Sequence, residues 1–331
     1  MTSLITVRPE GLYCEAGDFY IDPWKPVGTA LITHAHSDHA RSGSEQYYAT
    51  QVSEGILHKR LGQEIKLNGV QYGDKFKIGE TWISFHSAGH VLGSAQVRVE
   101  HKDEVWVVSG DYKRCGDPTN DPFEVVECDA FITEATFGLP IYRWASGKET
   151  AEQIYNWWQS DPERPSLLFC YSFGKAQRVL GELTKFTDKT VYVHGAVHVL
   201  TEIYRQVGVD MVPTVPTSEM EKSDKFQGDL VIAPPSGHRS SWMKRFKRPQ
   251  TAFASGWMAV RGARRRRGYE RGFVLSDHAD WPGLVKTVKE TKAKKVYVTH
   301  GQTEVLSRYL REEMAIDAVP LKTLYEGEGD I

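Results

Sequence analysis

Three histidines and an aspartate crowd into residues 34–39, directly after a short apolar run. That run, residues 30–33, has the pattern of a buried strand, and the sequence after it is His-Ala-His-Ser-Asp-His. Imidazole and carboxylate groups suit zinc, manganese and iron. Side chains two residues apart at a strand end point the same way, so the first two histidines can share one ion while Asp38 and His39 turn towards another. The run therefore predicts a site for two metal ions.

Three further candidate ligands follow separate apolar runs. His90 comes after residues 82–85, Asp111 after residues 105–108 and His300 after residues 295–299. Short runs rich in β-branched and aromatic residues are typical of strands. Each candidate also has a glycine beside it, and glycine permits close backbone turns. We therefore expect several strands to deliver these side chains to one rim.

The order of these residues resembles the metallo-β-lactamase superfamily. The matching elements are the HxHxDH run, a lone histidine, an aspartate and a terminal histidine. The resemblance implies an α/β fold, a four-layer αββα sandwich, with two divalent ions at one edge of its paired sheets. It implies one ion held by His34, His36, His90 and Asp111, and a second held by Asp38, His39, Asp111 and His300, with Asp111 as the bridge. Asp22 lies where the family has a buried aspartate that orients the histidine loop.

Further motifs resemble those of the β-CASP nucleases, which include Artemis-type DNA nucleases, RNase J and the cleavage subunit of pre-mRNA 3′-end processing. They contain Glu134 in FITEAT, His278 in LSDHAD and His300 in VTHG. The resemblance implies catalytic roles for Asp38, Asp111, Glu134 and His278, with Glu134 bonded to His278 near the substrate phosphate. A carboxylate beside an imidazole generally favours the protonated ring, which suits it to donate a proton.

The pattern of the chain changes after residue 138. Beyond this point helices are predicted over residues 149–158 and 175–186, alternating with strands over residues 167–170 and 191–193. Further helices are predicted over residues 53–61 and 304–314. In β-CASP proteins a small α/β unit interrupts the lactamase-like domain. The resemblance thus implies a metallo-β-lactamase domain at residues 1–138 and 269–331, and an inserted β-CASP domain at residues 139–268.

Basic residues gather inside the predicted insertion, although the formal net charge of the chain is −2. Residues 238–272 hold eleven lysines and arginines against one acid. The candidate contacts to nucleic-acid phosphates are Arg261, Arg264, Arg265, Arg266 and Arg267, with Ser172 and Lys175 at a predicted strand-to-helix turn. The alternatives are a solvated face for the arginines and an ordinary tight turn for Ser172 and Lys175.

Two metal ions and a basic segment together predict phosphodiester hydrolysis by a hydroxide that the ions activate. Within the β-CASP group, residues 254–258 and 276–281 resemble the bacterial exonucleases associated with ATP-dependent DNA ligases. That resemblance implies a DNA exonuclease in DNA repair, with a ligase and a helicase encoded nearby as candidate partners. The residues themselves choose neither between DNA and RNA nor between zinc and manganese. The alternatives are an RNA-processing ribonuclease, a small-substrate hydrolase on the same fold, and a non-catalytic nucleic-acid scaffold.

The cysteines and the apolar runs predict a cytoplasmic protein with no membrane partner. The four cysteines among 331 residues show no CxxC spacing, so we expect reduced thiols. The N-terminal residues lack an apolar core for export, and no run approaches the ~20 apolar residues of a membrane span.

Overall fold

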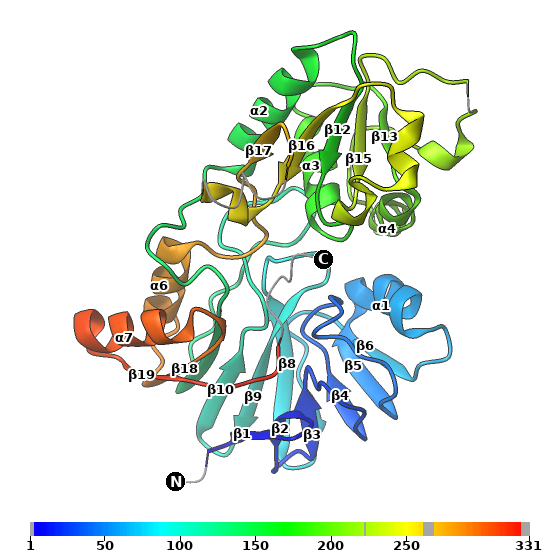
Figure 1. Ribbon diagram of the computed structural model, residues 1–331. Coiled ribbons are helices and arrows are strands. Elements are labelled where there is room, and N and C mark those ends of the chain that lie inside the picture. The colour runs from blue at the N-terminus through cyan, green and yellow to red at the C-terminus, as the bar shows by residue number, and fades with distance from the viewer. Residues whose placement is uncertain (1–2, 222, 261–267, 326–331) are drawn as a thin grey trace. The chain divides into compact units, whose positions relative to one another are not determined.

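The computed structural model describes residues 3–221, 223–260 and 268–325. The chain forms two compact units. Unit 1 consists of Met1–Arg114, Asp121–Arg143 and His278–Asp330, and unit 2 of Cys115–Asn120 and Trp144–Asp277. Both units combine helices with sheets, which confirms the α/β class expected from the sequence (Figure 1).

Unit 1 contains two sheets, each with a parallel and an antiparallel part. The first has the order β1-β2-β3-β4-β5-β6, formed by Ile5–Arg8, Gly11–Cys14, Phe19–Ile21, Thr29–Leu31, Gln46–Thr50 and Leu67–Val70. The second has the order β19-β18-β11-β10-β9-β8-β7, formed by Asp317–Pro320, Lys295–Gly301, Ala130–Ala135, Glu104–Val108, Ala95–His101, Thr81–Ser87 and Phe76–Ile78. Strands β3 to β6 run parallel to one another, and so do β10, β11, β18 and β19.

The two sheets of unit 1 bury a common core. Phe19 and Leu31 of the first sheet pack in one cluster with Phe85 and Val97 of the second, and all four side chains are fully buried. Each such side chain stabilises the fold by about 1.5–3 kcal/mol relative to exposure. The second sheet also packs against helices α6 (Trp281–Glu290) and α7 (Thr303–Met314). Helix α1 (Glu54–Leu61) lies beside β5 and β6, as Figure 1 shows.

Unit 2 is built on one parallel sheet. Its order is β14-β13-β15-β12-β16-β17, formed by Thr214–Pro216, Val191–Val193, Leu230–Ala233, Ser166–Phe169, Gln250–Ala254 and Arg271–Phe273. Among the described residues of this unit, the α-helices are α2 (Gly147–Gln159), α3 (Lys175–Leu183) and α4 (Gly195–Gln206). Short 3-10 turns occur at Gln51–Ser53 in unit 1, and at Thr217–Glu219, Pro235–Gly237, Ser241–Arg245 and Gly256–Ala259 in unit 2.

Most predicted helices and strands are confirmed, with ends shifted by a few residues. The helix expected over residues 149–158 spans Gly147–Gln159, because Ser146 and Glu149 form a reciprocal capping box at its start. The helix expected over residues 175–186 ends at Leu183. Strand β17 pairs with β16, so the sheet of unit 2 extends to Phe273, and the chain passes to unit 1 only after Asp277. The domain limits at residues 138 and 268 stay a prediction.

Of the helices in the described part of the chain, none combines the length and the apolar character that crossing a bilayer requires.

Unit 2 contains a buried ionic network centred on Arg178 of α3. The Arg178 side chain is 1% exposed. Its Nη1 donates to the Ser276 carbonyl oxygen at 2.6 Å and lies 3.4 Å from Asp277 Oδ1, while its Nε lies 3.5 Å from Asp117 Oδ2. Lys175 Nζ lies 3.5 Å from the other oxygen of Asp277. One guanidinium therefore joins the segment around residue 117 to the segment that ends unit 2.

Replacing Arg178 with methionine should destabilise unit 2 by about 3–5 kcal/mol, because the carboxylates of Asp277 and Asp117 would lose a buried partner. Urea unfolding followed by circular dichroism measures the loss, and hydrogen exchange of the α3 amides assigns it to unit 2. The control is Arg308→Met, which breaks the exposed Arg308–Glu312 pair and should cost less than about 1 kcal/mol. Equal unfolding curves for the two variants would contradict the assignment.

Candidate metal centre

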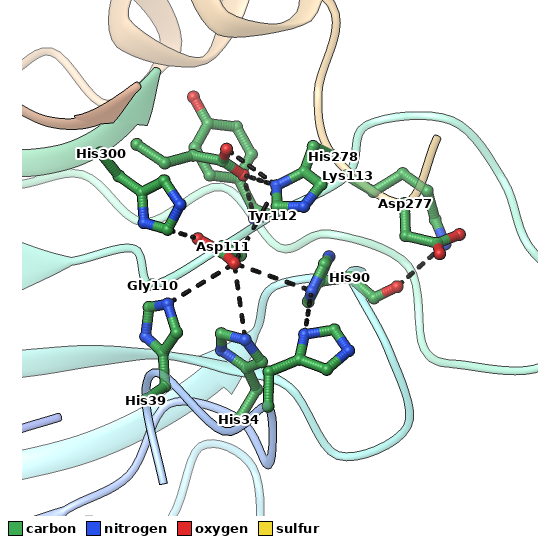
Figure 2. A network of polar contacts seen from close by, with 12 residues as sticks. His34, His39, His90, Gly110, Asp111, Tyr112, Lys113, Asp277, His278 and His300 are labelled. Carbon is green, nitrogen blue, oxygen red and sulfur yellow. Dashed lines mark hydrogen bonds and ion pairs between the residues drawn. The ribbon is translucent and has the colours of Figure 1, made fainter. Parts of the chain in front are cut away.

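The seven residues predicted as metal ligands come from strand ends of both sheets in unit 1. Residues 34–39 follow β4, His90 follows β8, Asp111 follows β10 and His300 lies at the end of β18. The structure brings them into two adjoining groups, His34-His36-His90-Asp111 and Asp38-His39-His300, in which the possible ligand atoms lie within 4.8 Å of one another. Figure 2 shows the labelled imidazoles gathered around the Asp111 carboxylate.

The Asp111 carboxylate lies at the centre of this cluster. Its Oδ2 is 3.5 Å from His34 Nε2, 3.6 Å from His39 Nε2 and 3.9 Å from His90 Nε2. Its Oδ1 is 3.8 Å from His300 Nδ1. These separations exceed those of hydrogen bonds. They lie near the roughly 3.3–3.5 Å expected between two ligand atoms bound tetrahedrally to one zinc ion at about 2.0–2.1 Å.

Several buried polar atoms of the cluster lack a hydrogen-bond partner among the described residues. They are Nε2 of His34, Nε2 of His39, Oδ1 of Asp111 and both ring nitrogens of His300. An unsatisfied buried polar atom costs about 1–3 kcal/mol. A cavity of about 10 Å³, lined among others by His39, Asp111 and His300 but not by His34, has room for one water-sized body. The donor set and this space fit bound divalent cations.

The imidazoles differ in the charge state that their surroundings favour. Burial lowers the pKa of His34 well below its usual value, and the neighbouring His39 and His90 lower it further. His34 is therefore neutral near pH 7, which is the form that binds metals. Burial also acts to lower the pKa of His39, but the carboxylates of Asp111, Asp38 and Asp22 outweigh it and raise the pKa to about 10. The three carboxylates thus favour the protonated, positively charged form of the His39 ring.

Asp22 holds the histidine loop from outside the ligand set. Its Oδ1 accepts the Thr33 amide hydrogen at 2.7 Å, and its Oδ2 lies 2.7 Å from His39 Nδ1. With Nδ1 engaged by Asp22, the Nε2 atom of His39 faces Asp111. The structure thus shows the contacts of Asp22, and its orienting role in a metal site stays a prediction.

The backbone is tightly packed where the ligands emerge. Gly301 has φ +90°, and a Cβ there would lie 2.4 Å from the Ala135 carbonyl oxygen. A Cβ at Gly110 would lie 2.5 Å from Thr33 Oγ1. His300 itself adopts φ +58°, which is uncommon for a residue with a side chain. The glycines next to the ligands are therefore required by close backbone approach.

His278 and Glu134 form a buried pair beside Asp111. His278 Nδ1 lies 2.9 Å from Glu134 Oε2, and the other oxygen of Glu134 accepts the Tyr112 amide hydrogen at 2.7 Å. Burial acts to raise the pKa of Glu134, but the charge and hydrogen bond of His278 outweigh it and lower the pKa. Glu134 therefore stays ionised. It links His278 to the residue that follows Asp111.

Two residues of the site were missed from the sequence. Lys113 is buried, and its Nζ donates to the His90 carbonyl oxygen at 3.1 Å, so it fixes the loop that carries a candidate ligand. Tyr325 stacks on His39 with ring centroids 4.8 Å apart and planes 6° apart. The position of Lys113 two residues after Asp111 was the one available signal. Nothing in the local sequence around Tyr325 indicated its contact.

Of the residues predicted to contact phosphates, only Ser172 and Lys175 lie in the described part of the chain. Arg261 and Arg264–Arg267 lie outside the described residues. Ser172 is half-buried, and its carbonyl oxygen accepts a hydrogen bond from Gln177. Lys175 is fully buried and paired with Asp277, so a phosphate contact by Lys175 would require this ion pair to open.

No protein-family model matches the chain. A probable DNA ligase from Opitutus terrae is 28% identical over 307 residues, which cover 91% of this chain. The chain spans only 30% of the length of that ligase. An RNase J-like protein from Methanocaldococcus jannaschii is 22% identical, covering 84% of this chain and 82% of that protein. A ribonuclease from Thermus thermophilus is 29% identical over 147 residues, 36% of this chain and 34% of that enzyme.

Among solved structures, a protein of unknown function from Enterococcus faecalis aligns with a TM-score of 0.62. The alignment covers 90% of this chain and 80% of that protein at 12% identity, so it bears on the fold alone. Over most of its length the chain is thus similar to part of a probable DNA ligase and to an RNase J-like protein, and over about a third of its length to a ribonuclease.

Proposed function

We propose that this chain is a metal-dependent nuclease that hydrolyses phosphodiester bonds of nucleic acid. The observation that carries the proposal is the position of the buried Asp111 carboxylate between two groups of imidazoles, several of whose nitrogens have no hydrogen-bond partner among the described residues. Both the RNase J-like relative and the ribonuclease relative bear names of nucleic-acid hydrolases, which supports the same reaction class.

The proposed ligands form two sets that share one residue. His34, His36, His90 and Asp111 would hold one ion, and Asp38, His39, Asp111 and His300 the other, with zinc or manganese as the cofactor. Bound there, such ions would lower the pKa of water and neutralise charge that develops on the phosphate. Asp22 would keep the His39 ring in the orientation that presents Nε2.

His278 is proposed to act on the leaving oxygen. Its Nδ1 is engaged by Glu134, so Nε2 is the nitrogen that would meet the substrate. The ionised Glu134 stabilises positive charge on the ring and so favours a proton at Nε2 that can be donated. Glu134 would position His278 through this hydrogen bond, and its second oxygen would fix the backbone next to Asp111.

We further propose that the substrate is DNA and that the role is exonucleolytic, in DNA repair. The support is a probable DNA ligase, of which one segment matches 91% of this chain. In that protein, a sequence similar to this chain is part of the same polypeptide as the ligase. RNA is the second candidate, because the other relatives are named as ribonuclease or RNase J-like.

Unit 1 is proposed as the metallo-β-lactamase domain and unit 2 as the inserted β-CASP domain. The two sheets of unit 1 share a core, and α6 and α7 cover the second sheet, as a layered sandwich requires. Unit 2 interrupts unit 1 in the sequence and has a parallel sheet of its own.

Metal binding tests the shared role of Asp111. We expect wild-type protein to bind two manganese or zinc ions, His36→Ala and His300→Ala to lose one each, and Asp111→Ala to lose both, because only Asp111 belongs to both sets. Metal analysis of equilibrium-dialysed protein measures the stoichiometry. His58→Ala, on α1, is the matched control. Full stoichiometry in Asp111→Ala would rule out the bridging role.

Cleavage of end-labelled nucleic acid tests the reaction itself. Wild-type protein with manganese should degrade DNA from an end, and His36→Ala should abolish the activity because a metal ligand is removed. Single- and double-stranded DNA and RNA are compared with manganese, zinc and magnesium. Preferential degradation of RNA would select the ribonuclease candidate. Full activity of a correctly folded His36→Ala protein would refute the metal-dependent mechanism.

His278→Ala should keep its metal ions but lose about 10²–10⁴-fold in turnover, because proton donation is removed while the ligands stay. Single-turnover cleavage at saturating enzyme separates the chemical step from binding. Glu134→Gln should lower the same rate constant and change its pH dependence, since the charge beside His278 is removed. An unchanged rate constant in His278→Ala would exclude this residue from the mechanism.

A further inference from the structure

A basic cavity of about 530 Å³ lies in unit 2 and shares no residue with the metal centre. It is lined by segments that precede three strands: Arg164 before β12, Lys225 before β15, and Arg245, Lys247 and Arg248 before β16. These strands are parallel neighbours, so their amino-terminal ends lie at one edge of the sheet. Residues far apart in the sequence thus converge on one surface.

The charge of the cavity is predominantly positive. Its five cationic side chains face two acids, Glu163 and Asp224. Both acids are engaged locally, because Glu163 accepts a hydrogen bond from Gln227 at 2.7 Å and Asp224 accepts the Glu221 amide hydrogen at 2.8 Å. The cavity therefore presents an excess of positive charge to an anion.

Two of the arginines are held in fixed positions, Arg245 by neutral groups and Arg164 by carbonyl oxygens together with the acids Glu270 and Asp161. Arg245 donates to the Thr217 carbonyl oxygen at 2.5 Å and lies over the ring of Phe226. Arg164 donates to the carbonyl oxygens of Arg248 and Pro249, and it also pairs with Glu270. Carbonyl oxygens and an aromatic ring orient a guanidinium without cancelling its charge. Arg245 is accordingly a preorganised cation.

The other three cationic side chains of the cavity are less constrained than Arg164 and Arg245. Lys225, Lys247 and Arg248 are exposed, and no ion pair involves them within residues 3–221, 223–260 and 268–325. Their charges are therefore available to a ligand, unlike the buried Lys175 and Arg178 of the same unit.

The depression continues along the edge of the sheet. A second cavity of about 450 Å³ is lined by Lys189, by Tyr192 of β13 and by Asp229, and it shares Gln227 with the first. Together the two cavities extend from the start of β16 to the start of β13, across four neighbouring strands. The first cavity is basic, whereas the second holds one lysine and one acid. An elongated depression with a basic end fits a chain of phosphates better than one compact anion.

We propose that the amino-terminal edge of the unit 2 sheet binds the phosphodiester backbone of a nucleic-acid strand, as a binding surface separate from the metal centre. The identity of the polymer rests on the proposed nuclease function. Lys247 and Arg248 contact phosphates, and Arg245 provides fixed positive charge beneath them.

The test uses full-length Lys247→Gln/Arg248→Gln protein in an Asp111→Ala background, in which a labelled 20-nucleotide DNA strand is not cleaved. Fluorescence anisotropy measures the affinity at several salt concentrations. We expect about tenfold weaker binding and a salt slope smaller by about one for each phosphate that the variant no longer neutralises. The control is Lys77→Gln/Lys289→Gln in the same background, which removes two exposed charges outside the cavity.

An affinity and a salt slope equal to those of the control would overturn the inference. Equal weakening of the strand and of inorganic triphosphate would reveal a small-anion site and overturn it as well. The cleavage assay on wild-type protein keeps the two proposals apart. Strand binding that depends on Lys247 and Arg248 without any cleavage removes the nuclease proposal alone, whereas cleavage with control-like binding removes this inference alone.

Discussion

The buried carboxylate of Asp111 is the group on which the arrangement of the metal centre depends. Burial raises its pKa, while the charges of His39 and His300 lower it. The surroundings shift the pKa values of two neighbouring imidazoles in opposite directions. They favour the neutral form of His34 and the protonated form of His39. Protein groups alone leave buried nitrogens unpaired within the described residues. Metal cations on both sides of Asp111 would bind these atoms. They would thereby offset the free-energy cost of burying polar atoms without hydrogen-bond partners.

The fold makes this concentration of polar groups tolerable by fixing the strand ends on which they stand. Phe19, Leu31, Phe85 and Val97 lock the two sheets of unit 1 against each other, so the loops that leave their edges have fixed starting points. Backbone strain occurs in one of those loops. His300 has φ +58° and is followed by Gly301, where backbone contact excludes a side chain. A rigid core thus supports a strained rim, as preorganised sites require.

The sequence predicted the site better than its surroundings for a physical reason. Candidate ligands such as His34 and His90 follow strand-like runs and carry distinctive chemistry, so the sequence could single them out before the structure showed them in one cluster. The Asp22 and Glu134 contacts could be expected only through the family resemblance. Lys113 and Tyr325 could not, since a lysine that donates to the His90 carbonyl and a tyrosine stacked on His39 depend on how distant segments pack. Helix ends moved because caps such as Ser146 act locally and outweigh periodicity.

The cations of unit 2 divide into two classes with different physical roles. Lys175 and Arg178 are buried and paired with Asp277 and Asp117. A buried ion pair contributes little net stability compared with apolar packing, so its effect is geometric: Arg178 fixes Ser276 and Asp277, the two residues directly before His278. Lys225, Lys247 and Arg248 are exposed before the amino-terminal ends of β15 and β16, where desolvation costs nothing until a ligand arrives. The number of basic residues in the sequence does not distinguish the buried cations from the exposed ones. Burial separates those that hold the chain from those that can hold an anion.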